Sequence, residues 1–145
     1  MTRIHRSVRL AKDPEQVVNY ISDVQNHPAF ISALTSISNL SGDSHRPGTT
    51  WSWSFVMAGI EIEGSAETTK FEPGKVFAYK TTSGVESQFS YRVEAGRDGN
   101  DLVVEVNYEP PQGVLGRVVD KALIERQNEA EADRTIANLK AIFSD

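Results

Sequence analysis

The stretch of sequence that decides the fold is residues 102–143, which read LVVEVNYEPPQGVLGRVVDKALIERQNEAEADRTIANLKAIF. In residues 102–108 apolar side chains occupy every second position, which is the period of a strand with one face toward a core. The prolines at 110–111 end that strand. Residues 114–143 then contain no proline and one glycine, Gly116. They predict a helix about 45 Å long, enough to cross a whole sheet.

Further short strands precede this stretch and are separated by turn residues. The alternation predicts strands at about residues 35–40, 51–56, 60–67, 76–82 and 85–93. Turn signals between them are Ala58-Gly59, Pro73-Gly74, Ser83-Gly84 and the hairpin run Gly96-Arg97-Asp98-Gly99-Asn100. Connections this short join antiparallel neighbours, so the sequence predicts an antiparallel sheet with one solvent-facing side.

The amino-terminal part predicts one more strand and two short helices. Residues 2–10 alternate between apolar and polar side chains. The run Asp13-Pro14-Glu15-Gln16 supplies a capping residue and a proline suited to the first helical position. We expect that helix to run to about Val24 and to be broken at Asn26-His27-Pro28. A second short helix is expected over the next residues, 30–34.

This order of elements predicts an α+β protein in which a strongly curved antiparallel sheet of about six or seven strands wraps around the long C-terminal helix. We expect a single domain over residues 1–145, because this length is typical of one domain. A bent sheet and a straight helix cannot meet along their full length. We therefore expect an apolar cavity between them, of the kind that holds small molecules.

Local motifs along nearly the whole chain match a known family in their order. They are Ser7-Val8-Arg9-Leu10, Asp13-Pro14-Glu15-Gln16-Val17, Ile21-Ser22-Asp23, Pro28-Ala29-Phe30, Pro47-Gly48-Thr49, the turn at 69–73 and Thr135-Ile136-Ala137-Asn138-Leu139-Lys140. Together they resemble the START-related helix-grip superfamily (SRPBCC), and within it the polyketide cyclase/dehydrase-like branch. The resemblance implies the helix-grip fold and a cup that binds hydrophobic ligands. Members of the superfamily are lipid or sterol carriers, coenzyme-Q-binding proteins, plant hormone-binding proteins, and cyclases or dehydratases of polyketides.

Composition excludes several classes of function. Fifteen Lys and Arg against twenty Asp and Glu give a net charge of −5, which argues against a general nucleic-acid binder. The chain has no cysteine, so disulfides, thiolate metal sites and cysteine nucleophiles are excluded. Residues 1–6 lack the apolar core of a signal peptide, and no stretch is apolar enough to span a membrane. We expect a cytoplasmic protein without stable membrane insertion; its oligomeric state stays open.

Aromatic and apolar side chains are the first candidates for a ligand-binding wall. Aromatic rings bring large apolar area, and Tyr and Trp add one polar group each. The candidate ligand-binding residues of this kind before the long helix are Phe30, Trp51, Trp53, Phe55, Phe89, Tyr91 and Tyr108. The candidates on the long helix are Leu115, Val119 and Ala122. The alternative for each of them is a place in the core between sheet and helix.

Polar residues interrupt the apolar stripe of the long helix. At 100° per residue, the stripe passes over Glu125, Glu129 and Asp133. We interpret Glu129 as a candidate ligand anchor or acid/base, with Arg6 on the inward side of the first strand as its opposite charge. Tyr91 is the second candidate for acid/base work. The alternative is a solvated helix edge, since Glu and Arg side chains reach solvent easily.

No other motif points to catalysis. His5, His27 and His45 are scattered without the spacing of metal ligands, so we expect no metal and no cofactor. The sequence leaves two functions open. The first is binding or carriage of a hydrophobic small molecule, such as a lipid, quinone, sterol-like or polyketide-like compound. The alternative is a polyketide cyclase or dehydratase that uses a cavity acid/base.

Overall fold

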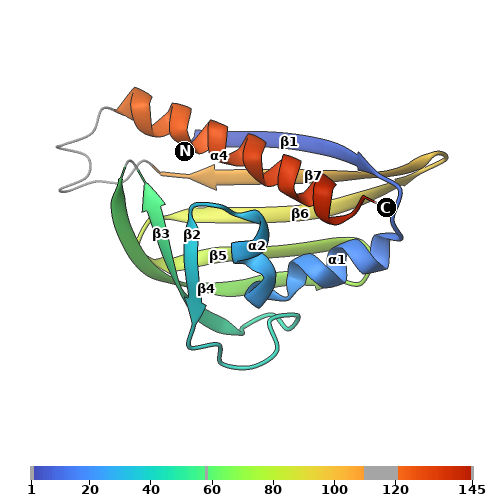
Figure 1. Cartoon of the computed structure of the whole chain (residues 1–145). Coiled ribbons are helices and arrows are strands. Elements are labelled where there is room, and N and C mark those ends of the chain that lie inside the picture. Colours follow the sequence, from blue (N-terminus) through green and yellow to red (C-terminus); the bar gives the residue numbers. More distant parts are fainter. Residues whose placement is uncertain (1, 58, 110–120, 145) are drawn as a thin grey trace.

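The computed structural model describes residues 2–57, 59–109 and 121–144 (Figure 1). Their elements are, in chain order, β1 (Thr2–Leu10), α1 (Pro14–Ser22), a 3₁₀ turn (Val24–Asn26), α2 (His27–Phe30), β2 (Leu34–Ser38), β3 (Thr50–Met57), β4 (Ile60–Glu72), β5 (Val76–Ser83), β6 (Ser87–Gly96), β7 (Gly99–Tyr108) and α4 (Lys121–Ile142). Each predicted strand has a counterpart within this part of the chain. The second short helix was expected at 30–34 but lies at His27–Phe30, because Pro28 fits a first helical turn and Leu34 already begins β2.

The seven strands found in the described residues form one antiparallel sheet in the order β1-β7-β6-β5-β4-β3-β2. From β3 to β7 each strand pairs with the one before it in the sequence, which is the pattern of an antiparallel meander. β1 is the exception, because it pairs with β7, with Ile4 opposite Val106 and Thr2 opposite Tyr108. This pairing brings the start of the chain beside the strand that precedes the C-terminal helix.

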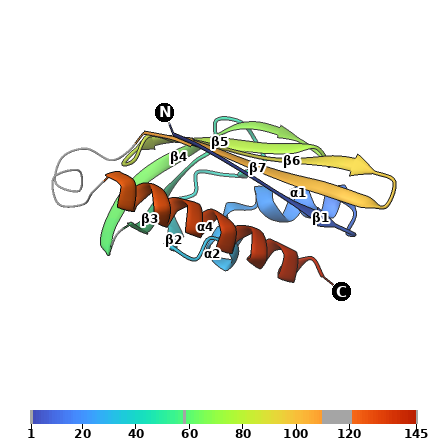
Figure 2. The same cartoon turned by 90° about the horizontal axis from the view of Figure 1, so that it is seen from above.

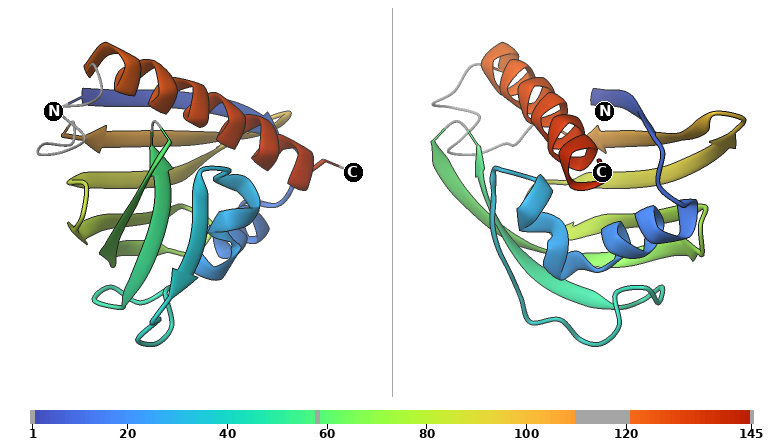
Figure 3. Two further views of the ribbon diagram at one scale, coloured as in Figure 1. Left: turned by 60° about the vertical axis from the view of Figure 1, so that its left-hand side comes forward. Right: turned by 45° about the vertical axis from the view of Figure 1, so that its right-hand side comes forward.

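The helices cover one side of the curved sheet (Figure 2). α4 lies across that side and packs against β1, α2 and β3. Figure 3 shows how β3 and β4 bend around, so that the sheet partly encloses the helices. A curved antiparallel sheet that grips a C-terminal helix is the helix-grip fold, as the sequence predicted.

The core lies where α1, α2 and the last turns of α4 meet the concave face of the sheet. Asp13 caps α1 through a hydrogen bond from the Glu15 amide at 2.9 Å, and Val17 and Ile21 on the inner face of that helix are fully buried. Further core residues come from all the helices, the 3₁₀ turn, the residue after α4 and the inner face of the strands, and include Leu10, Val18, Val24, Phe30, Trp51, Ala66, Phe77, Leu102, Leu139 and Phe143.

The first helix ends earlier than the sequence predicted. We expected it to reach about Val24 and to be broken by His27 and Pro28. Instead α1 ends at Ser22, and the side chain of Asp23 caps the following 3₁₀ turn by accepting from the Gln25 amide at 3.2 Å. Pro28 stands in the first turn of α2, where a proline is tolerated because that amide needs no intrahelical partner.

The long C-terminal helix is confirmed over the part that the structure describes. α4 is described from Lys121 to Ile142, a length of about 33 Å. The predicted start at Val114 lies outside the described residues. In the described part of the chain, no helix combines the length and the apolar character needed to cross a lipid bilayer.

Candidate functional site

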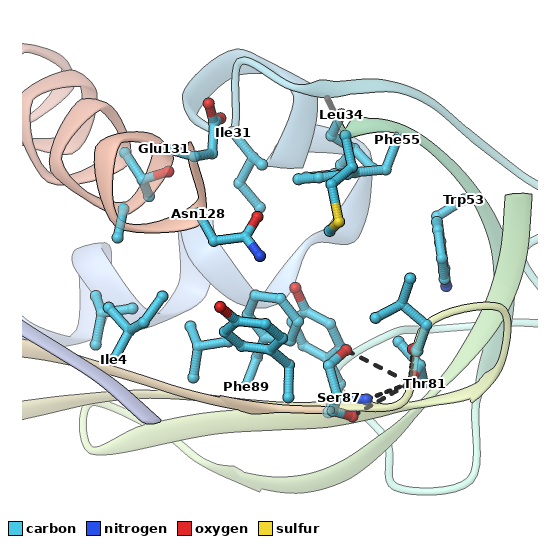
Figure 4. Close-up of a pocket in the computed structure, with 18 of the residues that line it drawn as sticks. Ile4, Ile31, Leu34, Trp53, Phe55, Thr81, Ser87, Phe89, Asn128 and Glu131 are labelled. Carbon is cyan, nitrogen blue, oxygen red and sulfur yellow. Dashed lines mark hydrogen bonds between the residues drawn. The ribbon is translucent and has the colours of Figure 1, made fainter. Parts of the chain in front are cut away.

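A cavity of about 130 Å³ lies between the concave face of the sheet and α4, partly open to solvent (Figure 4). The described residues that line it are Ile4, Ile31, Leu34, Trp53, Phe55, Met57, Tyr79, Thr81, Val85, Ser87, Phe89, Tyr91, Val104, Val106, Tyr108, Asn128, Glu131, Ala132 and Thr135. Most of this lining is apolar, with a few polar groups between, which is typical of a small-molecule site.

The cavity exists because α4 presents small or polar side chains toward the middle of the sheet. Asn128, Ala132 and Thr135 are the α4 residues that leave this space. On either side of them α4 is anchored by larger apolar side chains, Ile124 before and Leu139 after, which are 1% and 0% exposed. The helix is therefore held to the sheet at both ends and stands away from it between them.

The indole of Trp53 forms one wall of the cavity (Figure 4). Two glycines make room for it behind that wall. A Cβ atom on Gly64 would lie 2.5 Å from Trp53 Cζ2 and would overlap the carbonyl oxygen of Ser83, and one on Gly84, where φ is +87°, would lie 2.7 Å from Trp53 Cη2. The Nε1 atom of Trp53 is buried and has no hydrogen-bond partner within the described part of the chain.

Thr81 and Ser87 satisfy each other's polar groups at the edge of the cavity. Thr81 Oγ1 donates a hydrogen bond to the carbonyl oxygen of Val85 at 2.6 Å and accepts one from the Ser87 amide at 2.8 Å. Figure 4 shows these bonds closing the connection between β5 and β6. These two side chains therefore shape the wall of the cavity.

Two buried phenols, Tyr79 and Tyr91, line the sheet side of the cavity. Their ring centroids are 6.5 Å apart, and the side chains are 7% and 2% exposed. Burial raises the pKa of both phenols, and the neighbouring Tyr91 side chain raises the pKa of Tyr79 further. Both phenols are neutral at physiological pH and can serve as hydrogen-bond partners but not as bases.

A third phenol, Tyr108, lies at the end of the cavity where β7 meets α4. It is 3% exposed, and its hydroxyl makes no hydrogen bond of good geometry within the described residues. Burial raises the pKa of Tyr108, and the carboxylates of Glu125 and Glu129 act in the same direction, whereas the nearby side chains of Asn128 and Thr2 lower it. The carboxamide of Asn128 points into the cavity (Figure 4).

Glu131 is the one carboxylate among the described lining residues. Its side chain is only 10% exposed, and its oxygens accept hydrogen bonds from the Ser32 hydroxyl at 2.9 Å, the Ala33 amide at 2.8 Å and the Arg134 guanidinium at 2.8 Å. In Figure 4 this carboxylate points toward the α2–β2 connection, away from the middle of the cavity. Its acceptor sites are used to tie α4 to that connection.

The structure brings together five of the sequence-predicted aromatic residues. Trp53, Phe55, Phe89, Tyr91 and Tyr108 all line the cavity. They come from β3 and from the β6–β7 hairpin, which are far apart in the sequence and share the concave face of the sheet.

Two other predicted aromatic residues lie in the filled core, outside the described lining. Phe30 is 0% exposed and Trp51 is 2% exposed. Phe30 packs against His27 with ring centroids 5.3 Å apart, and Trp51 against Tyr79 at 5.4 Å. The alternative interpretation from the sequence, a place in the core, describes both of them.

The predicted charged pair is not brought together. Glu129 lies on the exposed side of α4, and the Arg6 Nε atom instead donates to Asp133 Oδ1 at 2.7 Å. Ala122 is also exposed. Leu115 and Val119 lie outside the described residues. A helical phase that starts from Leu115 predicts Glu129 on the inner face of the helix, whereas the described inner face carries Asn128 and Glu131.

The histidines show no common site. His27 is 1% exposed, and its Nε2 atom lies 2.8 Å from the carbonyl oxygen of Ile21. Burial lowers its pKa to about 4, so the ring is neutral and donates that hydrogen bond. His45 lies on an outer loop, with Nδ1 2.5 Å from Asp43 Oδ1. Nowhere in the described ranges do three His, Asp or Glu side chains gather where they could hold a metal ion.

Sequence reasoning missed the polar residues of α4 that line the cavity, Asn128, Glu131 and Thr135. The sequence does carry a pattern that identifies these residues. Ile124, Asn128, Glu131, Thr135 and Leu139 are spaced by three or four positions and therefore share one helix face. Taking the phase from Leu139 backward would have found them.

A family model described as polyketide cyclase/dehydrase and lipid transport matches residues 1–144 of this chain. Three similar solved structures have low sequence identity. A major latex-like protein of Panax ginseng is 12% identical with a TM-score of 0.72, covering 99% of this chain and 98% of that one. The Zhui aromatase/cyclase of Streptomyces is 13% identical with a TM-score of 0.72, covering 97% and 92%.

The third is a protein of Deinococcus radiodurans that is 19% identical with a TM-score of 0.68, covering 97% of this chain and 95% of that one. At these identities the likeness shows the fold alone. No curated protein matches the sequence.

Proposed function

The chain belongs to the polyketide cyclase/dehydrase and lipid transport family, and from this premise we propose that it binds or carries a hydrophobic small molecule in the cavity under α4. The observation that carries the proposal is the cavity itself, which is lined by Trp53, Phe55, Phe89 and other apolar side chains. Buried apolar surface favours an apolar ligand by about 25 cal/mol per Å². The polar groups among its walls orient a ligand.

A cyclase or dehydratase is the second candidate, supported by the fold shared with the Streptomyces aromatase/cyclase. Loss of water from a β-hydroxy ketone needs a base for the carbon-bound proton and a donor for the departing hydroxyl. Tyr79 and Tyr91 are suited to the donor role, because burial keeps both phenols protonated. The carboxylate of Glu131 is occupied by hydrogen bonds, so the described lining supports binding better than catalysis.

Filling the cavity tests the binding proposal. Ala132 lines the cavity, whereas Ala137 is exposed on the same helix. Ala132→Leu places three extra carbons in the space, and we expect it to weaken binding of methylnaphthalene at least about tenfold, by calorimetry, with an unchanged fold by circular dichroism. Ala137→Leu is the matched control and should bind like the unaltered protein.

Equal affinities for the two variants, or no binding by the unaltered protein, would contradict a ligand site under α4. Native mass spectrometry of the purified protein adds the identity of any molecule that it retains. A β-hydroxy ketone that is dehydrated by the unaltered protein, but only bound by the Tyr91→Phe variant, would favour the enzyme instead.

A further inference from the structure

One end of the cavity holds a buried hydroxyl that lacks a hydrogen bond. Tyr108 is 3% exposed, and its Oη atom is enclosed without a partner in the described part of the chain. Buried polar groups are nearly always hydrogen-bonded, and an exception points to a ligand or a water that completes the site. Since Tyr108 also lines the cavity, its enclosed hydroxyl stands at the edge of the space that a ligand would occupy.

A second polar group stands beside this hydroxyl. The carboxamide of Asn128 projects from α4 into the cavity (Figure 4), and it lies close enough to Tyr108 to affect the ionisation of the phenol. A phenol and a carboxamide both donate and accept hydrogen bonds without carrying a charge. Together they can bind one oxygen atom of a ligand, whether it is a hydroxyl or a carbonyl.

The charges near this end disfavour an anionic ligand. None of the described lining residues is Lys, Arg or His, and Glu131 uses its charge on Arg134. A carboxylate placed against these described lining residues would lose hydration with no cationic side chain among them to offset the loss.

We propose that Tyr108 and Asn128 form the polar subsite of the cavity and bind a hydroxyl or carbonyl oxygen of an uncharged hydrophobic ligand. The inference rests on the proposed function, since it requires a ligand in the same cavity. It goes beyond that function by naming the ligand's polar group and the two side chains that select it.

Three probes of one shape test the subsite. Naphthol, methylnaphthalene and naphthoate carry a hydroxyl, a methyl or a carboxylate at the same ring carbon, and calorimetry at neutral pH gives their dissociation constants. In the Tyr108→Phe and Asn128→Leu variants, we expect naphthol binding to weaken about two- to tenfold, the effect of one net hydrogen bond, while methylnaphthalene binds as before. In the unaltered protein naphthoate should bind at least about tenfold more weakly than naphthol.

Matched controls remove the same chemical groups elsewhere. Tyr20→Phe removes a phenol hydroxyl outside the described lining, and Gln127→Met removes a carboxamide from the exposed side of α4. Both should leave all three affinities unchanged. Retained binding of methylnaphthalene in the test variants shows that they are folded.

The outcomes separate the inference from the proposed function. Naphthol binding that survives both test variants, or naphthoate that binds as tightly as naphthol, would overturn the subsite while leaving a ligand-binding cavity in place. If methylnaphthalene and naphthol both fail to bind the unaltered protein, the proposed function fails and the subsite with it.

Discussion

The concave face of the sheet carries aromatic side chains along its whole length, yet one end is filled and the other is hollow. At the filled end, beneath α1 and α2, the rings of His27, Phe30 and Phe77 are each at most 1% exposed and contact one another. At the hollow end, beneath the middle of α4, Trp53 and Phe89 face a cavity. The strands supply aromatic rings to both ends.

The difference between the two ends comes from the helices. α1 and α2 bring large apolar side chains such as Ile21 and Phe30 down onto the sheet. The middle of α4 brings Asn128, Ala132 and Thr135, which are too small or too polar to fill the same depth. Close packing is the rule for protein interiors, so the hollow reflects the choice of helix residues. The filled end therefore supplies stability, and the hollow end is where the proposed ligand would bind.

Truncating one aromatic side chain at each end gives the largest expected contrast. Phe30→Ala removes a fully buried ring at the filled end, and we expect a loss of about 3–5 kcal/mol in the free energy of unfolding. Phe89→Ala removes a half-buried ring that stacks on Tyr79 at 4.7 Å but borders the cavity on its other side. Because that side lacks protein contacts, we expect less than half the loss.

Urea denaturation of both variants measures the contrast. Phe89→Ala should also change the affinity for methylnaphthalene, because the variant enlarges the cavity. Losses of the same size at Phe30 and Phe89 would mean that the hollow end is packed as tightly as the filled end, which would contradict the difference between them.

The filled end should also make stability depend on pH. Burial of His27 lowers its pKa from the ordinary 6.5 to about 4. Between these values the unfolded chain takes up a proton that the folded chain does not, so the free energy of unfolding decreases as the pH falls from 6.5 to 4. The contribution of this shift to the free energy of unfolding is about 3 kcal/mol. It is complete above pH 6.5, the pKa of His27 in the unfolded chain, and is lost as the pH falls to 4.

A variant that replaces His27 alone isolates this contribution from that of the carboxylates. His27→Gln keeps a group that can donate to the Ile21 carbonyl but no longer titrates. We expect it to be less stable at pH 7 and to have a flatter stability profile between pH 6.5 and 4. His5→Gln, at an exposed position on β1, is the control and should keep the original slope, whereas equal slopes for the His27 variant and the unaltered protein would contradict a buried neutral ring.

The order of elements could be predicted well from the sequence, because it rests on local patterns. Alternation located the strands, Asp13 and Pro14 located α1, and the proline-free stretch located α4. The same alternation placed Trp53, Phe55 and Phe89 on one face of the sheet, and they line the cavity. These features follow from two-residue and helical periods read over short windows.

The polar residues of the cavity were harder to predict because they depend on how α4 is rotated against the sheet. An error of one position in helical phase turns a side chain by about 100°, and this separates Glu129, which is exposed, from Asn128, which lines the cavity. Arg6 was on the inward side as expected, but its partner is Asp133. Pairings between distant segments cannot be obtained from a local period.

The smallest expected effect concerns Glu131, where the hollow end meets α2. Glu131→Ala leaves the Ala33 amide and the Ser32 hydroxyl without their acceptor, and we expect a loss of about 1–3 kcal/mol in the free energy of unfolding. Glu131→Gln retains one acceptor oxygen and should lose less. The bond to Arg134 adds little, because that side chain is 57% exposed.

Asp133→Ala is the matched control for this variant. It also removes a carboxylate from α4, but Asp133 is 66% exposed and pairs with the partly exposed Arg6, so we expect a change below about 1 kcal/mol. Glu131 ties α4 to the α2–β2 connection, which is flanked by Ile31 and Leu34 on the cavity wall. We therefore expect Glu131→Ala also to release methylnaphthalene faster, as measured by stopped flow. A release rate unchanged from that of Asp133→Ala would mean that the cavity is held together by its apolar contacts, with the carboxylate serving stability alone.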